Sequence, residues 1–306
     1  MGIGKAVSFV LLFVMLVIAL FLLYDILSLK FAQPVEYVFF GENVNQSSYD
    51  SELQFYKDMR FNHKGITYNF RANCEDSKRE NMKAALDFLR SEVGLINFEE
   101  ISKDGDIEIL CGREFLSGED VFVAGEGGPT KIINSSEFNV ITKGKIVLYK
   151  ESCGYNVELH ELLHVFGFDH SKNPKSIMYN ISSCNQEMTQ DIIDEMKRLY
   201  SIQELPDLHF SKVEAERRGR YLDFDVEVSN SGLTDADEVM LFIFSGEKEV
   251  DRFELDRISF GGGKVLKVSN LKLPLLEGGE VRFFVDGFDE IQELDETNNE
   301  VILTVE

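Results

Sequence analysis

Three of the five histidines in the chain fall within one segment of eleven residues, from His160 to His170. The segment reads His-Glu-Leu-Leu-His-Val-Phe-Gly-Phe-Asp-His. His160 and His164 are four residues apart, so on a helix their side chains lie on one face and can bind one cation together. The spacing therefore predicts a metal site built on a helix.

A glycine and a third histidine follow this pair. Gly167 suits the end of the helix, because glycine adopts the left-handed conformation at the lowest cost. The turn can then deliver His170 as a third nitrogen ligand. Three imidazoles with an open fourth position are typical of a catalytic zinc site rather than a structural one. The two-histidine pattern alone also occurs on ordinary surface helices, but the added glycine and histidine make chance a poor explanation.

Glu161 adjoins the first ligand and is of the right type for a general base. A zinc ion lowers the pKa of its bound water, and Glu161 would take the proton as that water attacks a peptide carbonyl. The same carboxyl group would then return the proton to the leaving amine. The segment therefore predicts hydrolysis by a water activated by Glu161.

The extended motif is followed by Met178 within Ser-Ile-Met-Tyr, and together they resemble the metzincin clan of metallopeptidases. Asp-His-Ser at 169–171 and Pro-Lys-Ser-Ile-Met-Tyr at 174–179 are most similar to the matrixin (matrix metalloprotease) family. The resemblance implies a zinc endopeptidase with a structural turn at Met178 beneath the metal. It also implies that Tyr179 and Asn180 line the substrate pocket, although matrixins usually carry proline where this chain has Asn180.

Periodicity around the motif predicts the elements that position it. Helices are expected at 77–93, ending at Gly94, at 156–166 and at 189–200. Short strands are expected at 36–40, 97–101, 106–111, 131–134 and 145–149, and the glycines at 124–128 are interpreted as breaks between strands. We expect residues 130–135 to supply the edge strand against which an extended substrate lies. The pattern predicts an α+β catalytic domain with a mixed twisted sheet, at residues 35–204.

Beyond Pro206 the hydrophobic period changes to two. Leu222, Phe224, Val226 and Val228 alternate with acidic residues, and similar alternation recurs near 239–244, 281–285 and 301–305. About seven short strands in about 100 residues predict an all-β sandwich at 206–306. Val-Ser-Asn-Ser-Gly at 228–232 and the segment 285–299 resemble the Ig-like, CARDB-like adhesion-related domains of surface proteins.

The N-terminus carries an uncharged apolar run of 19 residues, at 6–24. About 20 such residues cross a bilayer as a helix, so we predict a transmembrane signal anchor, preceded by a cytoplasmic stub at 1–5 and followed by a spacer at 25–34. A cleaved signal peptide is the alternative, but its apolar core is usually only about 7–15 residues long. Both interpretations export the rest of the chain, and the anchor places the protein in the cell membrane with its N-terminus inside.

The chain has 54 acidic and 31 basic residues, for a net charge of −23. Such a surface repels a phosphate backbone, which excludes nucleic acid as a partner class. The expected partners are protein or peptide substrates and, through the N-terminal helix, the membrane. Clustered carboxylates would also allow calcium binding, although a solvated acidic surface is the favoured explanation.

Four cysteines lie in the middle of the chain, and an even number in an exported domain predicts disulfides rather than buried free thiols. Three pairings are open. We favour Cys153–Cys184, because these residues bracket the metal segment and a crosslink would brace it, which leaves Cys74–Cys111.

These patterns predict a membrane-anchored extracellular zinc endopeptidase. Two other classes remain open: a catalytically inactive surface adhesion protein that acts through its sandwich, and a zinc hydrolase of a non-peptide substrate. Intact His160, Glu161, His164 and His170 argue against the inactive form.

Overall fold

The computed structural model of the protein describes residues 53–71, 74–112, 115–116, 122–149, 154–181, 183–274 and 279–305. The predicted membrane segment at 6–24 and the predicted strand at 36–40 lie outside these ranges. None of the described helices is long and apolar enough to cross a membrane.

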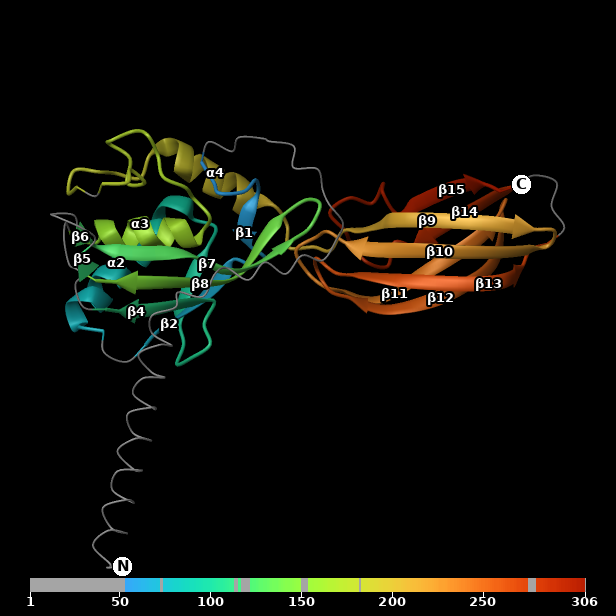
Figure 1. The fold of residues 1–306 in the computed structure, drawn as a ribbon, viewed down its shortest axis with the longest axis horizontal. Coiled ribbons are helices and arrows are strands. Elements are labelled where there is room, and N and C mark those ends of the chain that lie inside the picture. Colours follow the sequence, from blue (N-terminus) through green and yellow to red (C-terminus); the bar gives the residue numbers. More distant parts are fainter. Residues whose placement is uncertain are drawn as a thin grey trace, which may run out of the picture. The chain divides into compact units, whose positions relative to one another are not determined.

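The first domain is built on a mixed sheet, as predicted (Figure 1). Five strands are parallel, and a sixth, β7, runs antiparallel to β8. One edge of β8 (Asn139–Leu148) pairs along its whole length with β7 (Gly125–Asn134). Its other edge pairs first with β1 (Met59–Phe61) and then with β4 (Ile107–Cys111), which is followed across the sheet by β2 (Gly65–Phe70) and β3 (Asn97–Glu100). Two short strands, β5 (Phe115–Leu116) and β6 (Phe122–Val123), pair with each other. The sequence analysis missed β1, β2, β5 and β6 and recognised only part of β7 and of β8.

Three helices complete this domain close to their predicted positions: α2 (Asp76–Val93), α3 (Asn156–Val165) and α4 (Gln190–Ser201). The C-cap of α2 is Gly94, in the left-handed conformation with a φ of 72°. One buried cluster joins the three helices to the sheet, and it includes Met82 and Leu89 of α2 and Leu162 and Leu163 of α3. The helix that carries the predicted ligands is therefore held by core packing and not only by its own propensity.

Strand β7 approaches α3 so closely that only glycine fits at two of its positions. A Cβ atom at Gly127 would lie 2.2 Å from the backbone oxygen of Glu161, and one at Gly125 would lie 2.7 Å from Glu161 Cγ. No atom lies within 4 Å of the corresponding position at Gly128. The glycines of this segment therefore do not break the sheet: they allow its edge strand to pack directly on α3.

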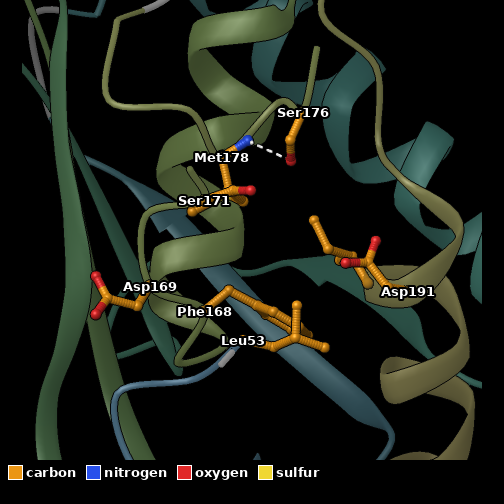
Figure 2. Close-up of a pocket in the computed structure, with 8 residues that line it drawn as sticks. Leu53, Phe168, Asp169, Ser171, Ser176, Met178 and Asp191 are labelled. Atoms are coloured by element: carbon orange, nitrogen blue, oxygen red, sulfur yellow. Dashed lines mark hydrogen bonds between the residues drawn. The ribbon is translucent and has the colours of Figure 1, made fainter. Parts of the chain in front are cut away.

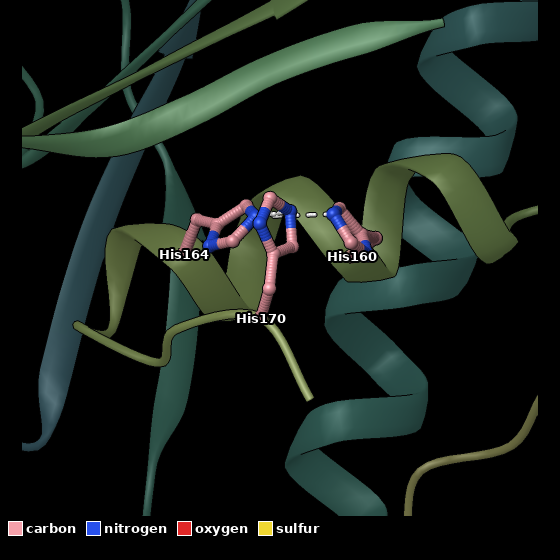
Figure 3. Close-up of side chains that lie close together, drawn as sticks. All are labelled: His160, His164 and His170. Carbon is pink, nitrogen blue, oxygen red and sulfur yellow. Dashed lines mark hydrogen bonds between the residues drawn. The ribbon is translucent and has the colours of Figure 1, made fainter. Parts of the chain in front are cut away.

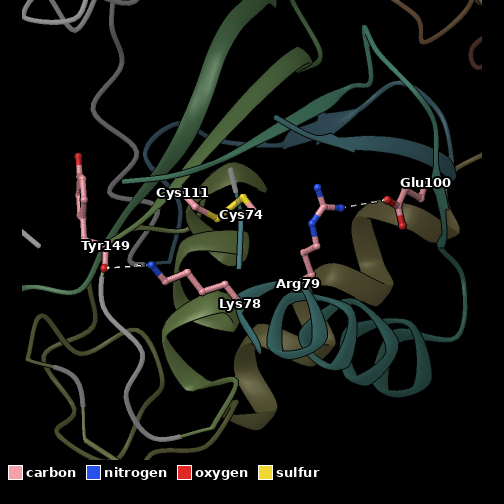
Figure 4. The surroundings of a disulfide bond; sticks show 6 residues. All are labelled: Cys74, Lys78, Arg79, Glu100, Cys111 and Tyr149. Atoms are coloured by element: carbon pink, nitrogen blue, oxygen red, sulfur yellow. Dashed lines mark hydrogen bonds and ion pairs between the residues drawn. A yellow bond between two sulfur atoms is a disulfide. The ribbon is translucent and has the colours of Figure 1, made fainter. Parts of the chain in front are cut away.

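A disulfide links Cys74, just before α2, to Cys111 at the end of β4, which confirms that predicted pair (Figure 4). Beside it the buried Lys78 donates a hydrogen bond to the carbonyl of Tyr149, at 3.3 Å. These links hold the start of α2 against the chain that leads towards α3. Cys184 is also disulfide-bonded. Its predicted partner, Cys153, lies outside the described residues.

Asp106 connects β2 with the segment that leads into β4. Its Oδ2 atom accepts hydrogen bonds from the hydroxyl and the backbone N–H of Thr67, at 2.7 and 2.9 Å, and lies 3.1 Å from Nε2 of His63. Burial alone would raise the pKa of Asp106, but the hydrogen bonds from His63 and Thr67 outweigh it and lower the pKa to about 2.

The second domain is a sandwich of two antiparallel sheets with seven strands, as predicted. One sheet has the order β13-β10-β9 and the other β12-β11-β14-β15. The strands are β9 (Leu208–Arg218), β10 (Tyr221–Asn230), β11 (Ala236–Ser245), β12 (Lys248–Ile258), β13 (Gly263–Lys272), β14 (Glu280–Val285) and β15 (Glu300–Thr304). Leu222, Phe224, Val226 and Val228 of β10 are buried, which confirms the alternation, and the ring of Phe224 lies 5.3 Å from that of Phe283.

The close approach of β7 to α3 predicts that alanine destabilises α3 at Gly127 but not at the neighbouring Gly128. Gly127→Ala should force the strand and the helix apart and lower the free energy of opening of α3 by about 1–3 kcal/mol. Amide hydrogen exchange of α3, read by mass spectrometry, measures this. Gly128→Ala is the matched control and should change exchange little. Equal protection in both variants would contradict the packing described here.

The lowered pKa of Asp106 predicts pH-dependent stability. The folded-state pKa lies below the ordinary value, so the carboxylate stabilises the fold above about pH 4, and this contribution disappears as the pH falls towards 2. Asp106→Asn should therefore lower the free energy of unfolding by about 2 kcal/mol at neutral pH, and by progressively less below about pH 4. Urea unfolding over this pH range tests the prediction. Asp104→Asn, at an exposed neighbouring position, should show no such trend.

Candidate metal centre

The three predicted ligands converge on one point (Figure 3). His160 and His164 lie one turn apart on α3 and are each 6% exposed, whereas His170 reaches the same point from the following loop and is exposed. The Nε2 atom of His164 lies 3.0 Å from Nε2 of His160 and 3.1 Å from Nε2 of His170. In the part of the chain that the structure describes, no other group of three or more His, Cys, Asp or Glu side chains is arranged to hold a metal. Calcium binding therefore remains a prediction from composition.

Two backbone carbonyls set the orientation of the buried imidazoles. Nδ1 of His160 lies 2.6 Å from the carbonyl oxygen of Ile177, and Nδ1 of His164 lies 2.7 Å from that of Phe168. A carbonyl can only accept, so each Nδ1 carries the proton and each Nε2 presents a lone pair. Burial lowers the pKa of both histidines, that of His164 to about 4, so both rings are neutral and able to bind a metal.

The turn after α3 brings His170 to the centre in the way that its glycine predicts. Gly167 has a φ of 87°, and its N–H donates to the carbonyl of His164 at 2.9 Å. A Cβ atom at this position would also lie 2.7 Å from Cβ of Met59. Both the left-handed backbone and the lack of space therefore require glycine at the point where the chain turns back.

The three nitrogens fit a zinc ion. The Nε2 atoms of His160 and His164 lie 3.0 Å apart, and neither carries a proton with which to form a hydrogen bond. Their lone pairs therefore repel each other, and a cation between them removes this repulsion. In a tetrahedral site with zinc–nitrogen distances of about 2.0–2.1 Å, two ligand nitrogens lie about 3.3 Å apart, close to the observed separations. The donor set and its spacing are those of a three-histidine site.

Glu161 is buried between α3 and the edge strand of the sheet. It is 6% exposed, and its carboxylate accepts a hydrogen bond from the backbone N–H of Gly127. Burial raises the pKa of Glu161 to about 8, and the nearby carboxylates of Glu126 and Glu158 act in the same direction. The sequence analysis did not foresee the part played by Gly127, because its partner lies 34 residues away. A cation held by the histidines would favour the ionised form of this carboxyl group.

Met178 lies in a buried turn beside the loop that carries His170. Its carbonyl accepts a hydrogen bond from Ser171 N at 2.8 Å, and its N–H donates to Ser176 Oγ at 3.2 Å. The same turn supplies the Ile177 carbonyl that orients His160. A structural role for this turn thus follows from its contacts.

A small pocket lies behind this loop, and its lining includes Met178 but neither Tyr179 nor Asn180 (Figure 2). It is lined by Leu53, Phe168, Asp169, Ser171, Ser176, Met178, Asp191 and Ile192. Tyr179 is half-buried and Asn180 is exposed, and their predicted role in substrate binding remains a prediction.

The remaining two histidines are engaged elsewhere. His63 contacts Asn62 and Asp106, and Nδ1 of His209 lies 3.3 Å from the hydroxyl of Ser231 in the second domain. Neither belongs to the cluster at α3. They therefore serve as internal controls for the metal centre.

Comparison with known proteins identifies both domains. Residues 60–201 match the matrixin family, and residues 205–302 match the CARDB family. No curated protein sequence matches the chain.

Among solved structures, the chain is similar to the CARDB domain of a Pyrococcus furiosus protein. The crystal structure of that domain, described as a complex with di-metal ions, is 18% identical and covers 34% of this chain and 90% of its own, with a TM-score of 0.28. A solution structure of the same domain is also 18% identical and covers 33% of this chain and 95% of its own, again with a TM-score of 0.28. From the two family matches, the chain consists of a matrixin-family domain followed by a CARDB domain.

Proposed function

We propose that this protein is a zinc endopeptidase anchored in the cell membrane, with both domains outside. The observation that carries the proposal is the convergence of three imidazole nitrogens, two of them held unprotonated by backbone carbonyls, on the helix and loop around the buried Glu161 carboxyl group. Membership of the matrixin family supports a zinc-dependent peptidase. The apolar run at 6–24 supports the anchor, and the Cys74–Cys111 disulfide suits an oxidising exterior.

The chemistry divides between the metal and the chain. A zinc ion held by His160, His164 and His170 would polarise the peptide carbonyl and lower the pKa of the attacking water. Glu161 accepts the proton of that water and returns it to the leaving amine. The N–H of Gly127 holds the Glu161 carboxylate in place during both transfers.

The substrate would lie along β7. This strand pairs with β8 on one side, and no described strand pairs with its other side. An extended peptide can add to such an edge through backbone hydrogen bonds. The predicted edge at 130–135 falls largely within β7, but the part of the strand next to Glu161 is Gly125–Gly127. We therefore place the scissile bond opposite the glycines rather than farther along the strand.

The role of Glu161 is tested by Glu161→Gln, which keeps the size of the side chain and removes the base. We expect zinc to remain bound and hydrolysis of a peptide library to fall about 100- to 10,000-fold. Metal content and cleavage products are both read by mass spectrometry, with and without a chelator. Glu80→Gln, at an exposed position on α2, is the control and should retain activity. Cleavage by Glu161→Gln at the wild-type rate would contradict the assignment.

The ligand set is tested by replacing histidines one at a time. Loss of a residue that only hydrogen-bonds to a metal ligand typically weakens metal binding about 10- to 100-fold. His170→Ala removes a ligand itself, so it should weaken zinc binding by more than this. His63→Ala and His209→Ala should leave the affinity unchanged. Titration against a chromophoric chelator gives all three dissociation constants. Three equal constants would show that the site is not the one described.

A further inference from the structure

The segment from Leu53 to Tyr56 precedes the matrixin match, yet it lies directly against the metal-binding loop. Asp169 N donates to the carbonyl of Leu53 at 2.9 Å, and Phe55 N donates to the carbonyl of Gly167 at 2.8 Å. Between these bonds Gln54 forms an antiparallel bridge with Phe168. The segment and the turn that delivers His170 therefore form one paired unit.

Gln54 anchors the segment from within. Its side chain is 4% exposed, and its amide nitrogen donates to the carbonyls of Met59, at 2.8 Å, and Phe166, at 3.3 Å. Its amide oxygen accepts from Met59 N at 3.1 Å. One buried amide thus joins the segment to both β1 and the end of α3, and its position cannot change without leaving buried polar groups unpaired.

Phe55 places its ring on a ligand. The centroids of the Phe55 ring and the His164 imidazole are 5.7 Å apart, and the ring planes differ by only 18°. This distance is typical of offset-stacked aromatic pairs. The Nδ1 atom of His164 bonds to the carbonyl of Phe168, which belongs to the same paired unit. The ring stack and this hydrogen bond, the two contacts of His164 outside the histidine cluster described above, therefore depend on the segment or on the residues bridged to it.

We propose that Phe55 is a positioning residue for the metal, acting through His164. The stack keeps the imidazole in the rotamer that points Nε2 at the other ligands, so zinc binding does not have to order the ring. The inference rests on the proposed zinc function. Loss of groups that orient a metal ligand typically costs about 10- to 100-fold in affinity.

The test compares variants of the full chain by zinc titration against a chromophoric chelator. Phe55→Ala should raise the zinc dissociation constant about tenfold, and Phe55→Leu, which keeps the apolar bulk without a flat ring, should also raise it. Phe55→Tyr retains the ring and should bind as the wild type does. Tyr56→Ala is the matched control, because Tyr56 is the neighbouring aromatic residue and is 39% exposed, compared with 40% for Phe55. This variant should bind zinc with the wild-type affinity.

Two further readouts separate positioning from folding. Thermal unfolding of the metal-free proteins should be nearly unchanged in Phe55→Leu, and cobalt(II) spectra should shift in the variants that lack the ring. An unchanged dissociation constant in Phe55→Ala and Phe55→Leu, or equal weakening in Tyr56→Ala, would overturn the positioning role. Failure of the wild type to bind zinc would instead overturn the proposed function and the inference with it.

Discussion

The metal centre depends on holding three imidazole nitrogens close together, although the lone pairs of the two buried ones repel each other until a cation lies between them. Two backbone carbonyls, those of Ile177 and Phe168, do this for the buried imidazoles by holding their protons on the far side of each ring. Both carbonyls come from the chain that follows α3. The Gly167 turn and the Met178 turn are therefore as much a part of the centre as the helix that bears the ligands.

A second constraint comes from the opposite side of α3. The edge strand lies within contact distance of Glu161, which excludes water from one side of the carboxyl group and supplies a single N–H donor, that of Gly127. Burial among other carboxylates disfavours the charged form of Glu161, whereas a cation at the histidines favours it. The ligands and the base thus depend on each other electrostatically.

The sequence alone predicted those features that depend on residues close together in the chain. The histidine spacing, the left-handed Gly167 and the three helices all follow from residues within a few turns of one another. It failed for β1 because Arg60, at the centre of that strand, is fully buried, bonded to the carbonyls of Phe61 and Leu199 and stacked 4.6 Å from the centroid of Tyr200. Hydrophobic patterns cannot anticipate a buried arginine that depends on Leu199 and Tyr200, which lie 139 and 140 residues farther along the chain.

Other departures have the same origin in distant contacts. In β11 the alternation is interrupted at Phe242, which is 2% exposed because Phe288 packs its ring on it at 4.9 Å. The glycines of β7 resembled a loop because the helix that requires them comes later in the chain. Nothing near Phe55 in the sequence indicates that its ring lies on His164.

The pairing of Leu53–Tyr56 with the metal-binding loop also has a mechanical consequence. A pull that reaches Leu53 is resisted by two backbone hydrogen bonds, one from Asp169 N to the Leu53 carbonyl and one from Phe55 N to the Gly167 carbonyl, and by the buried amide of Gln54. Tension that reaches Leu53 would therefore be transmitted to the residues that orient His164 and His170.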